Sequence, residues 1–303
     1  MFACLQITKE PPRLRKSAPP ALVRVELPGG APFFRLETAR RRRGDKSAAR
    51  GDKSAARGEL PWDEIERAAG RLRTRMLFPG EVTPPPQPAP RSAAQAQIEP
   101  GLRAFAPRRL PLLLCLRAAQ QVLQASHVPA RQLRVTVVDS KGALTRQLEP
   151  LVSLAGSLRV FTPEPQLYRA TAQQLQRRYG VTLILSSSPG CFAQSHVVIA
   201  DDLRLFTGRE TGLIFTPDAE TPLPNCRVAR CGAPVLPEAQ GCLCPPGIDP
   251  LLFACALYEL CGVKEMERLR FAAFGFDSVS QAYALEDLAA MVDKSCAAEI
   301  FRG

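Results

Sequence analysis

The sequence is poor in the features that anchor a chain in a membrane or send it out of the cell. No segment reaches the roughly 18 consecutive apolar residues that a transmembrane helix needs, and the apolar run at 110–116 is far shorter. The N-terminal stretch MFACLQITKEPPRLRK carries its charges after its apolar residues, the reverse of a secretory signal. These absences predict a cytoplasmic protein without a membrane segment.

Residues that commonly do chemistry are also scarce. The chain has two His, one Trp and four Tyr among 303 residues. No Ser or Cys stands in the G-x-S-x-G turn that presents a catalytic nucleophile, so triad-type hydrolysis has no support. His196 opens an apolar run, where we expect a partly buried structural imidazole rather than a base. The sequence assigns no catalytic residue.

A repeating pattern of short apolar runs is present from residue 134 onward. The runs lack the polar alternation of half-exposed strands and lie at 135–138, 158–161, 181–185, 196–200 and 213–215. Strands of this kind are buried on both faces, which is typical of a parallel sheet with crossover helices. The predicted fold class is α/β: a Rossmann-like parallel sheet, preceded by a small basic hairpin-plus-helix head and followed by a helical tail.

Helix-length segments accompany these runs. Apolar residues recur three and four positions apart at 61–77, 111–123, 143–154, 163–179, 250–260, 264–274 and 285–292. Asp249 suits an N-cap, and Gly180 and Gly262 suit left-handed C-caps. VRVEL and PFFRLE, on either side of Pro-Gly-Gly, predict a β-hairpin.

Composition divides the chain into four predicted parts. Residues 1–82 form the basic head, with a surface loop at 38–60 that holds the duplicated heptapeptide GDKSAAR. Residues 83–100 form a Pro-rich linker. Residues 101–248 form the Rossmann-like domain with its leading helix, and the helices of 249–303 are expected to pack on it.

Positive charge is concentrated in the first part of the chain. Residues 1–133 hold 24 Lys and Arg against 11 Asp and Glu, whereas residues 134–303 hold 16 against 18. A basic head can neutralise phosphates, so nucleic-acid binding is one alternative function. The basic stretches have little aromatic interleaving and no reading motif, and we therefore expect solvated loops there.

Candidate ligand-binding residues follow from the predicted sheet. In such sheets ligands sit at the carboxyl ends of the strands. The polar residues that follow these runs are Asp139, Ser140, Lys141, Gly142, Thr162, Ser186, Ser187 and Asp201. They are the predicted contacts for a small molecule of unspecified identity, although each is also a common helix-capping or turn residue.

The first predicted crossing lacks the dinucleotide fingerprint. The three glycine positions of G-x-G-x-x-G are taken by Asp139, Lys141 and Leu144. An aspartate where a pyrophosphate would lie repels it, and Lys141 compensates only in part. No cofactor is assigned on this basis, and an NAD(P)-dependent oxidoreductase remains an alternative.

The same turn also resembles a phosphohydrolase motif. An apolar strand followed by D-x-x-G-x-L-T, from Asp139 to Thr145, resembles the first motif of the haloacid-dehalogenase-like family. The resemblance implies a Mg²⁺-dependent enzyme with Asp139 as nucleophile, and Thr162 and Asp201 resemble its later positions. Lys141 departs from the family at the general-acid position, and the 22 residues between Asp139 and Thr162 leave no room for its flap.

As a whole, the chain resembles an uncharacterised bacterial protein family. The hairpin, the Trp-containing helix and the degenerate Rossmann-like domain of NAD(P)-binding type carry this resemblance, which implies no assigned activity. We therefore predict a ligand-binding or regulatory module without an intact dinucleotide fingerprint. The partner and the oligomeric state are not specified by the sequence.

Ten cysteines without a secretory signal predict reduced thiols. Cys226, Cys231, Cys242 and Cys244 are close enough in sequence to hold a structural Zn²⁺. Their C-x4-C-x10-C-x-C spacing lacks the paired C-x2-C units of common zinc sites, so small buried or loop thiols are the competing interpretation.

Overall fold

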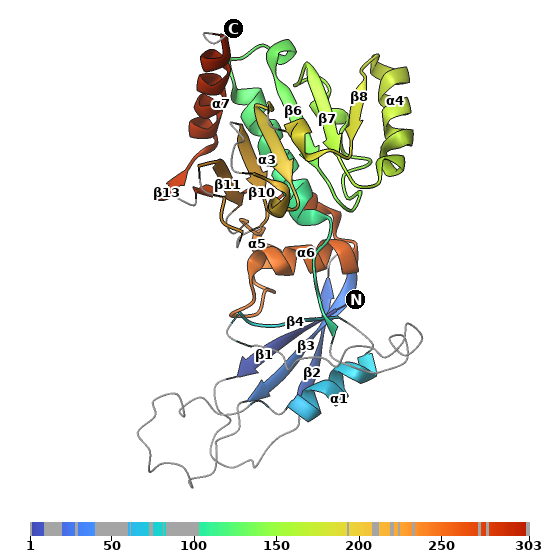
Figure 1. The fold of residues 1–303 in the computed structure, drawn as a ribbon. Helices are drawn as coiled ribbons and strands as arrows, with labels where there is room; N and C mark the ends of the chain where they lie inside the picture. Colours follow the sequence, from blue (N-terminus) through green and yellow to red (C-terminus); the bar gives the residue numbers. More distant parts are fainter. Residues whose placement is uncertain are drawn as a thin grey trace. The chain divides into compact units, whose positions relative to one another are not determined.

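The computed structural model divides the chain into two compact units. Unit 1 comprises Met1–Pro107 and Leu236–Met266, and unit 2 comprises Arg108–Val235 and Glu267–Gly303 (Figure 1). The residues described are 2–8, 20–27, 30–39, 60, 62–72, 75–80, 82, 103–192, 194–207, 212–218, 221–223, 225–231, 234–271, 274–276 and 279–300. The predicted linker at 83–100 and residues 40–59 of the repeat loop lie outside this set.

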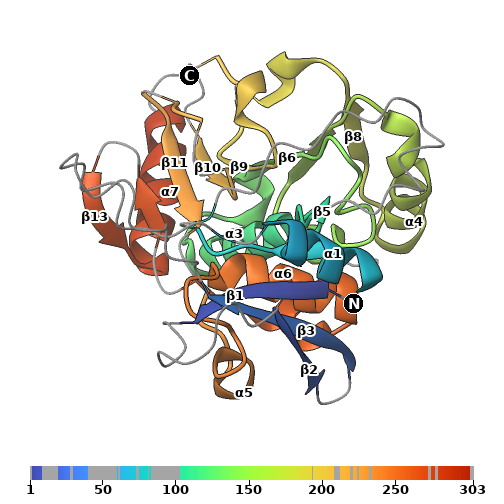
Figure 2. The same cartoon turned by 90° about the horizontal axis from the view of Figure 1, so that it is seen from below.

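Unit 1 is built on a five-stranded sheet in the order β2-β3-β1-β4-β5. Figure 2 shows its strands β1, β3 and β2 side by side. Its strands are β1 (Phe2–Thr8), β2 (Ala21–Leu27), β3 (Gly30–Ala39), β4 (Arg75–Leu77) and β5 (Arg103–Ala104). The antiparallel β2–β3 pair confirms the predicted hairpin. The helix predicted at 61–77 is wrong beyond Leu72, where α1 (Trp62–Leu72) ends, because Arg75–Leu77 pairs with β1 instead.

Alternate side chains of β1 point to opposite faces of this sheet, and each face has its own helix. Ala3 and Leu5 pack in one cluster with Ile65 of α1. On the other face, the ring of Phe2 stacks on Phe33 with centroids 5.0 Å apart, and both rings meet Phe253 edge-on. A strand between two helices is apolar on both sides, which removes the alternation that would have marked β1 in the sequence.

Phe253 belongs to α6 (Pro250–Cys261), which corrects one expectation. The boundaries of this helix are as predicted: the Asp249 side chain accepts the N–H of Leu251, and Gly262 ends it at φ 76°. However, α6 belongs to unit 1, where it packs on β1 and β3. Periodicity shows that a helix has an apolar face but not which sheet will cover it. A short helix, α5 (Glu238–Gly241), precedes it.

Unit 2 is built on an eight-stranded sheet in the order β13-β12-β11-β10-β9-β6-β7-β8. Its strands are β6 (Arg134–Val138), β7 (Ser157–Phe161), β8 (Leu183–Ser186), β9 (Val197–Ala200), β10 (Leu213–Thr216), β11 (Arg227–Cys231), β12 (Phe274–Phe276) and β13 (Val279–Tyr283). Strands β6 to β11 are parallel, and β12 and β13 are antiparallel additions at one edge. Counted from β6, the parallel order is 3-2-1-4-5-6, that of the Rossmann fold. The predicted α/β class is confirmed.

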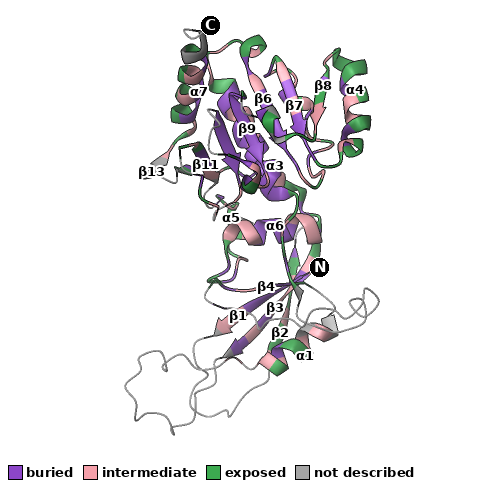
Figure 3. Ribbon diagram, viewed as in Figure 1, coloured by how far each residue is buried: buried purple, intermediate pink, exposed green. Residues whose placement is uncertain are grey.

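The two faces of this sheet are covered differently. Helices α3 (Leu110–Ala125) and α7 (Leu285–Ile300) pack on each other and on one face, over β9 and β10. A separate cluster joins apolar strand residues to Phe192, Leu203 and Phe206 from short 3₁₀ helices and loops. Figure 3 shows the central strands buried and much of α4 (Arg169–Tyr179) exposed. In the described part of the chain no helix is long and apolar enough to cross a membrane.

The helix predicted at 143–154 is wrong, and this matters for the site. The chain there forms turns and a single 3₁₀ helix at Glu149–Leu151. Pro150 has no N–H to donate, and the N–H groups of Leu151 and Val152 donate three residues back, at 3.0 and 3.1 Å. The segment 264–274 is likewise a 3₁₀ helix at Lys264–Arg268 followed by β12.

The other 3₁₀ helices are short connectors. They lie at Ala130–Gln132, Pro165–Tyr168, Pro189–Phe192 and Leu203–Leu205. The helix predicted at 163–179 is confirmed as Pro165–Tyr168 followed directly by α4, with Gly180 ending it at φ 67°. Among the described residues between β6 and β11, α4 is the only α-helix. The other described connections between these parallel strands consist of turns and short 3₁₀ helices.

Candidate functional site

The carboxyl ends of β6 and β9 bring two aspartates together. Val138 and Ala200 are register partners, and Asp139 and Asp201 directly follow them. Asp139 is completely buried, whereas Asp201 is partly buried. The predicted edge of the sheet therefore exists and carries the predicted residues.

The Asp139 carboxylate is held by the turn that follows it. Oδ1 accepts the N–H groups of Lys141 at 3.2 Å and Ala143 at 3.0 Å, and Oδ2 accepts the N–H of Leu144 at 2.8 Å. The phenol of Tyr168 also donates to Oδ2. Backbone donors that converge in this way form an anion-binding nest, and here the anion is the chain's own side chain.

Gly142 and Tyr168 explain why the turn closes on Asp139. Gly142 has φ 68°, a left-handed conformation that lets the backbone curl around the carboxylate. Burial, together with the neighbouring charge of Asp139, raises the pKa of Tyr168 well above its ordinary value. The phenol therefore keeps its proton and acts as a hydrogen-bond donor across the ordinary pH range.

Asp201 fixes the second residue of the same turn. Its Oδ2 accepts the N–H of Ser140 at 2.9 Å, and its Oδ1 accepts the Ser140 hydroxyl at 3.0 Å. Burial raises the pKa of Asp201, and the two bonds from Ser140 act in the opposite direction. Asp202 is also partly buried, but it pairs with the exposed Arg204, whose hydrogen bond lowers the pKa of that carboxyl.

The remaining predicted residues lie along the same edge but serve local turns. Thr162 is buried, donates its N–H to the Ser186 carbonyl at 3.0 Å and accepts the N–H of Glu164 at its hydroxyl. The Ser186 hydroxyl accepts the N–H of Ser188, and Ser187 and Lys141 are exposed. Their role as ligand contacts stays a prediction.

The four-cysteine zinc hypothesis also stays a prediction. Among the described residues, no group of three or more His, Cys, Asp and Glu side chains is arranged to hold a metal ion. Cys226 and Cys244 are partly buried and Cys242 is exposed, but the Cys231 side chain lies outside the described set. Cys226 and Cys231 belong to unit 2, whereas Cys242 and Cys244 belong to unit 1.

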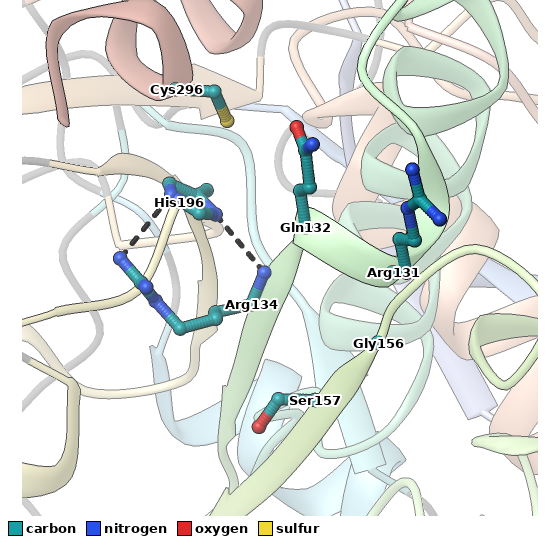
Figure 4. A pocket seen from close by; sticks show the side chains of 7 residues that line it. All are labelled: Arg131, Gln132, Arg134, Gly156, Ser157, His196 and Cys296. Atoms are coloured by element: carbon teal, nitrogen blue, oxygen red, sulfur yellow. Dashed lines mark hydrogen bonds between the residues drawn. The ribbon is translucent and has the colours of Figure 1, made fainter. Parts of the chain in front are cut away.

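A cleft of about 530 Å³ opens at the opposite, amino end of the parallel strands (Figure 4). Among the described residues, its lining carries two guanidinium groups, an imidazole and no carboxylate. The lining residues are Arg131, Gln132, Arg134, Gly156, Ser157, His196 and Cys296. Gly156 lets two backbone segments approach closely in this cleft, because a Cβ at that position would lie 2.3 Å from the Arg131 carbonyl oxygen.

Arg134 and His196 meet in this cleft because β6 and β9 are neighbours. The backbone N–H of Arg134 donates to His196 Nδ1 at 3.0 Å. Arg134 Nη2 lies 3.3 Å from the other ring nitrogen, Nε2, and Figure 4 marks this contact as well. A neutral imidazole has one acceptor nitrogen, so the tautomer of His196 decides which of the two contacts the ring accepts. The guanidinium is also held by its Nε–H, which donates to the Gln194 carbonyl at 2.6 Å.

Sequence reasoning missed most of this cleft. The sequence predicts only a structural role for His196 and does not identify the other lining residues. Arg134 and Ser157 begin β6 and β7, and His196 immediately precedes β9, so these residues lie at the amino ends of the strands. The general rule for such sheets points instead to the carboxyl ends. The available signal was the pair Arg131 and Arg134, just before the apolar run at 135–138.

Comparison with known proteins adds no evidence to that of the structure itself. No protein-family model matches the chain, and no curated sequence matches it. Among solved structures, quinate dehydrogenase from Corynebacterium glutamicum in complex with NAD aligns over 85% of this chain and 88% of that chain. The identity is 14% and the TM-score 0.30. At that score the alignment supports no argument about fold or function, and the assignment of unit 2 to the Rossmann-like class follows from its own strand order.

Proposed function

We propose that unit 2 is a small-molecule-binding module whose first crossing does not hold a dinucleotide. The observation that carries this proposal is the Asp139 carboxylate seated on the N–H groups of Lys141, Ala143 and Leu144. In a dinucleotide-binding turn, such donors and the N-terminus of the crossing helix face the pyrophosphate. Here the Asp139 carboxylate already accepts these N–H groups. The turn also leads into a 3₁₀ helix instead of an α-helix.

The same geometry weighs against the phosphohydrolase alternative. A nucleophilic carboxylate needs an oxygen that can reach phosphorus. Asp139 is fully buried, and both of its oxygens accept hydrogen bonds, one of them from Tyr168. A phosphoryl group would have to displace this network before any reaction, so we assign Asp139 a structural role.

Thermal unfolding with NAD and with NADP tests the first part of the proposal. We expect each dinucleotide to change the melting temperature by less than about 1 °C, because a ligand that does not bind the native state adds no stability. AMP and inorganic phosphate serve as smaller comparisons in the same assay. A saturable rise with NAD that is lost in Lys141→Ala would contradict the proposal, since it would place the dinucleotide at the first crossing.

We propose the cleft of Figure 4 as the ligand site, and inorganic phosphate is its simplest probe. Phosphate is expected to raise the melting temperature saturably, because the described lining of the cleft carries the guanidinium groups of Arg131 and Arg134 and no carboxylate. Arg134→Gln should abolish that rise. Arg177→Gln, on the exposed helix α4, is the charge-matched control and should keep it. A rise that survives Arg134→Gln would place the anion elsewhere.

A further inference from the structure

Strand β2 forms one edge of the unit 1 sheet, on the outer side of β3 (Figure 2). Among the described residues it is the longest edge strand of either sheet. It spans seven residues, Ala21–Leu27, whereas β5, β8 and β13 span two, four and five. In the described part of the chain β2 pairs with β3 alone, so the main-chain groups along its other side have no strand partner there. A long edge of this kind is a template for a further strand.

Strand β2 carries few of the features that protect an edge strand from pairing. It contains no proline and no lysine. Its pairing with β3 is irregular between Val25 and Leu27, but the extra residue belongs to β3, so β2 runs without a bulge of its own. Its two charged residues, Arg24 and Glu26, have opposite signs. Whether they repel or attract a second copy of β2 therefore depends on the register of the pairing.

Arg24 and Glu26 are accessible to a partner strand. They are two positions apart and so lie on the same face of β2. Arg24 Nε lies 2.7 Å from Glu26 Oε1, and the two side chains are 61% and 71% exposed. An ion pair with this exposure adds little to the stability of unit 1. On the opposite face, Val23 and Val25 are only partly buried, so both faces of the strand retain accessible surface.

Only one symmetric register of β2 against a second β2 brings opposite charges together. A two-fold axis normal to the sheet makes the residue on the axis face its own copy, with the neighbouring residues paired on either side. Three such registers pair five or more residues of β2, and they are centred on Val23, Arg24 and Val25. Centring on Arg24 sets two guanidinium groups opposite each other, and centring on Val23 sets Arg24 opposite Leu22 of the copy. Centring on Val25 sets Arg24 opposite Glu26 of the copy, and Glu26 opposite its Arg24.

We propose that unit 1 forms a homodimer through antiparallel pairing of β2 with β2 of a second copy of this chain, centred on Val25. Directly opposite charges of unlike sign stabilise an antiparallel pair and like charges destabilise it, so the charges select this register. The charges of the two Arg24–Glu26 pairs alternate on one face, and the two Val25 side chains meet on the other. The two five-stranded sheets become one continuous sheet. The interface lies in unit 1, so the proposal is independent of anion binding in the cleft of unit 2.

Sedimentation velocity of the full-length protein over a dilution series tests the proposal. The pairing involves one short strand and is smaller than a standard protein interface, so we expect a reversible dimer. The weight-average mass should rise with protein concentration from 33.0 kDa toward twice that value. A mass that stays at the monomer value up to several hundred micromolar protein would overturn the proposal and leave the edge to a different strand, such as an extended peptide.

Charge reversal within β2 tests the register. Arg24→Glu and Glu26→Arg each give β2 two charges of one sign, so either variant alone should dimerise at least about tenfold more weakly. An equimolar mixture of the two should dimerise again, because a strand with two acidic residues then faces a strand with two basic ones. The double variant Arg24→Glu/Glu26→Arg should dimerise like the unmodified protein, because its opposite charges still meet across the axis.

A control and a fold check separate this interface from general effects of charge. Arg177→Glu, on the exposed helix α4 of unit 2, makes the same change of charge as Arg24→Glu and should leave dimerisation unchanged. Thermal unfolding checks each fold, and the double variant keeps the register testable if a single reversal unfolds the protein. Dimers that persist in both single variants would place the contact on another surface. A loss that neither the mixture nor the double variant restores would refute the register centred on Val25.

Discussion

Replacement of Asp139 by Ala is expected to lower the free energy of unfolding of unit 2 by about 3–5 kcal/mol, the range for removing one partner of a buried charged network. The substitution leaves three backbone N–H groups and the Tyr168 hydroxyl without their acceptor. Because Asp139 is completely buried, water cannot take its place without opening the turn. Urea denaturation followed by far-UV circular dichroism measures the loss.

Two further variants identify the cause of that loss. Asp202→Ala removes a carboxylate at the same edge of the sheet, but this one pairs with an exposed guanidinium, so its effect should be about 0–1 kcal/mol. Tyr168→Phe deletes one donor of the Asp139 network and should fall between the two. Similar losses for Asp139→Ala and Asp202→Ala would mean that the buried network does not hold the turn together.

Replacement of Phe253 by Ala is expected to destabilise unit 1 by about 3–5 kcal/mol, the usual cost of deleting a fully buried aromatic ring. The Phe253 ring contacts Phe2 and Phe33 at centroid distances of 6.0 and 5.5 Å, and all three residues are completely buried. Its removal leaves a cavity between α6 and the sheet. The sole Trp, Trp62, lies in α1 of the same unit, so its fluorescence follows the unfolding of unit 1 selectively.

Leu252 is the neighbour of Phe253 in α6 and is only half-buried, so it provides the matched control. Leu252→Ala should cost about 1 kcal/mol, because it removes little buried surface. Hydrogen exchange should show the protection lost from β1 and β3 in Phe253→Ala. Loss confined to β6 and β9 would instead support the sequence-based expectation that this helix packs on the parallel sheet.

The crossing at Asp139 shows how this chain departs from a dinucleotide-binding fold while keeping its strand order. The 3-2-1-4-5-6 order brings the carboxyl ends of β6 and β9 together, as the fold requires. The turn between β6 and β7 then closes on an internal carboxylate, and Asp201 holds Ser140 beside it. The fold is thus retained and its usual phosphate contact is replaced by a structural one, which agrees with the general separation of fold from function.

Local pattern alone determined several parts of this protein. The runs at 135–138, 158–161 and 196–200 are apolar because their strands are buried on both faces, and a chain of this kind must place them inside a parallel sheet. Asp249, Gly180 and Gly262 set helix ends through short-range hydrogen bonds and backbone conformation, which involve only a few neighbouring residues. The absence of glycine from the three fingerprint positions, which are Asp139, Lys141 and Leu144, could also be read from the sequence.

Only the tertiary structure decided the rest, because the deciding contacts join residues far apart in the chain. Tyr168 completes the Asp139 network from 29 positions away, and His196 meets Arg134 from 62 positions away. The partner of α6 is a sheet that begins at Phe2, and Arg75–Leu77 is a strand because β1 offers it an edge. The periodicity of apolar residues shows that one face of a helix or strand must be buried. Which element covers that face depends on the packing of the whole unit.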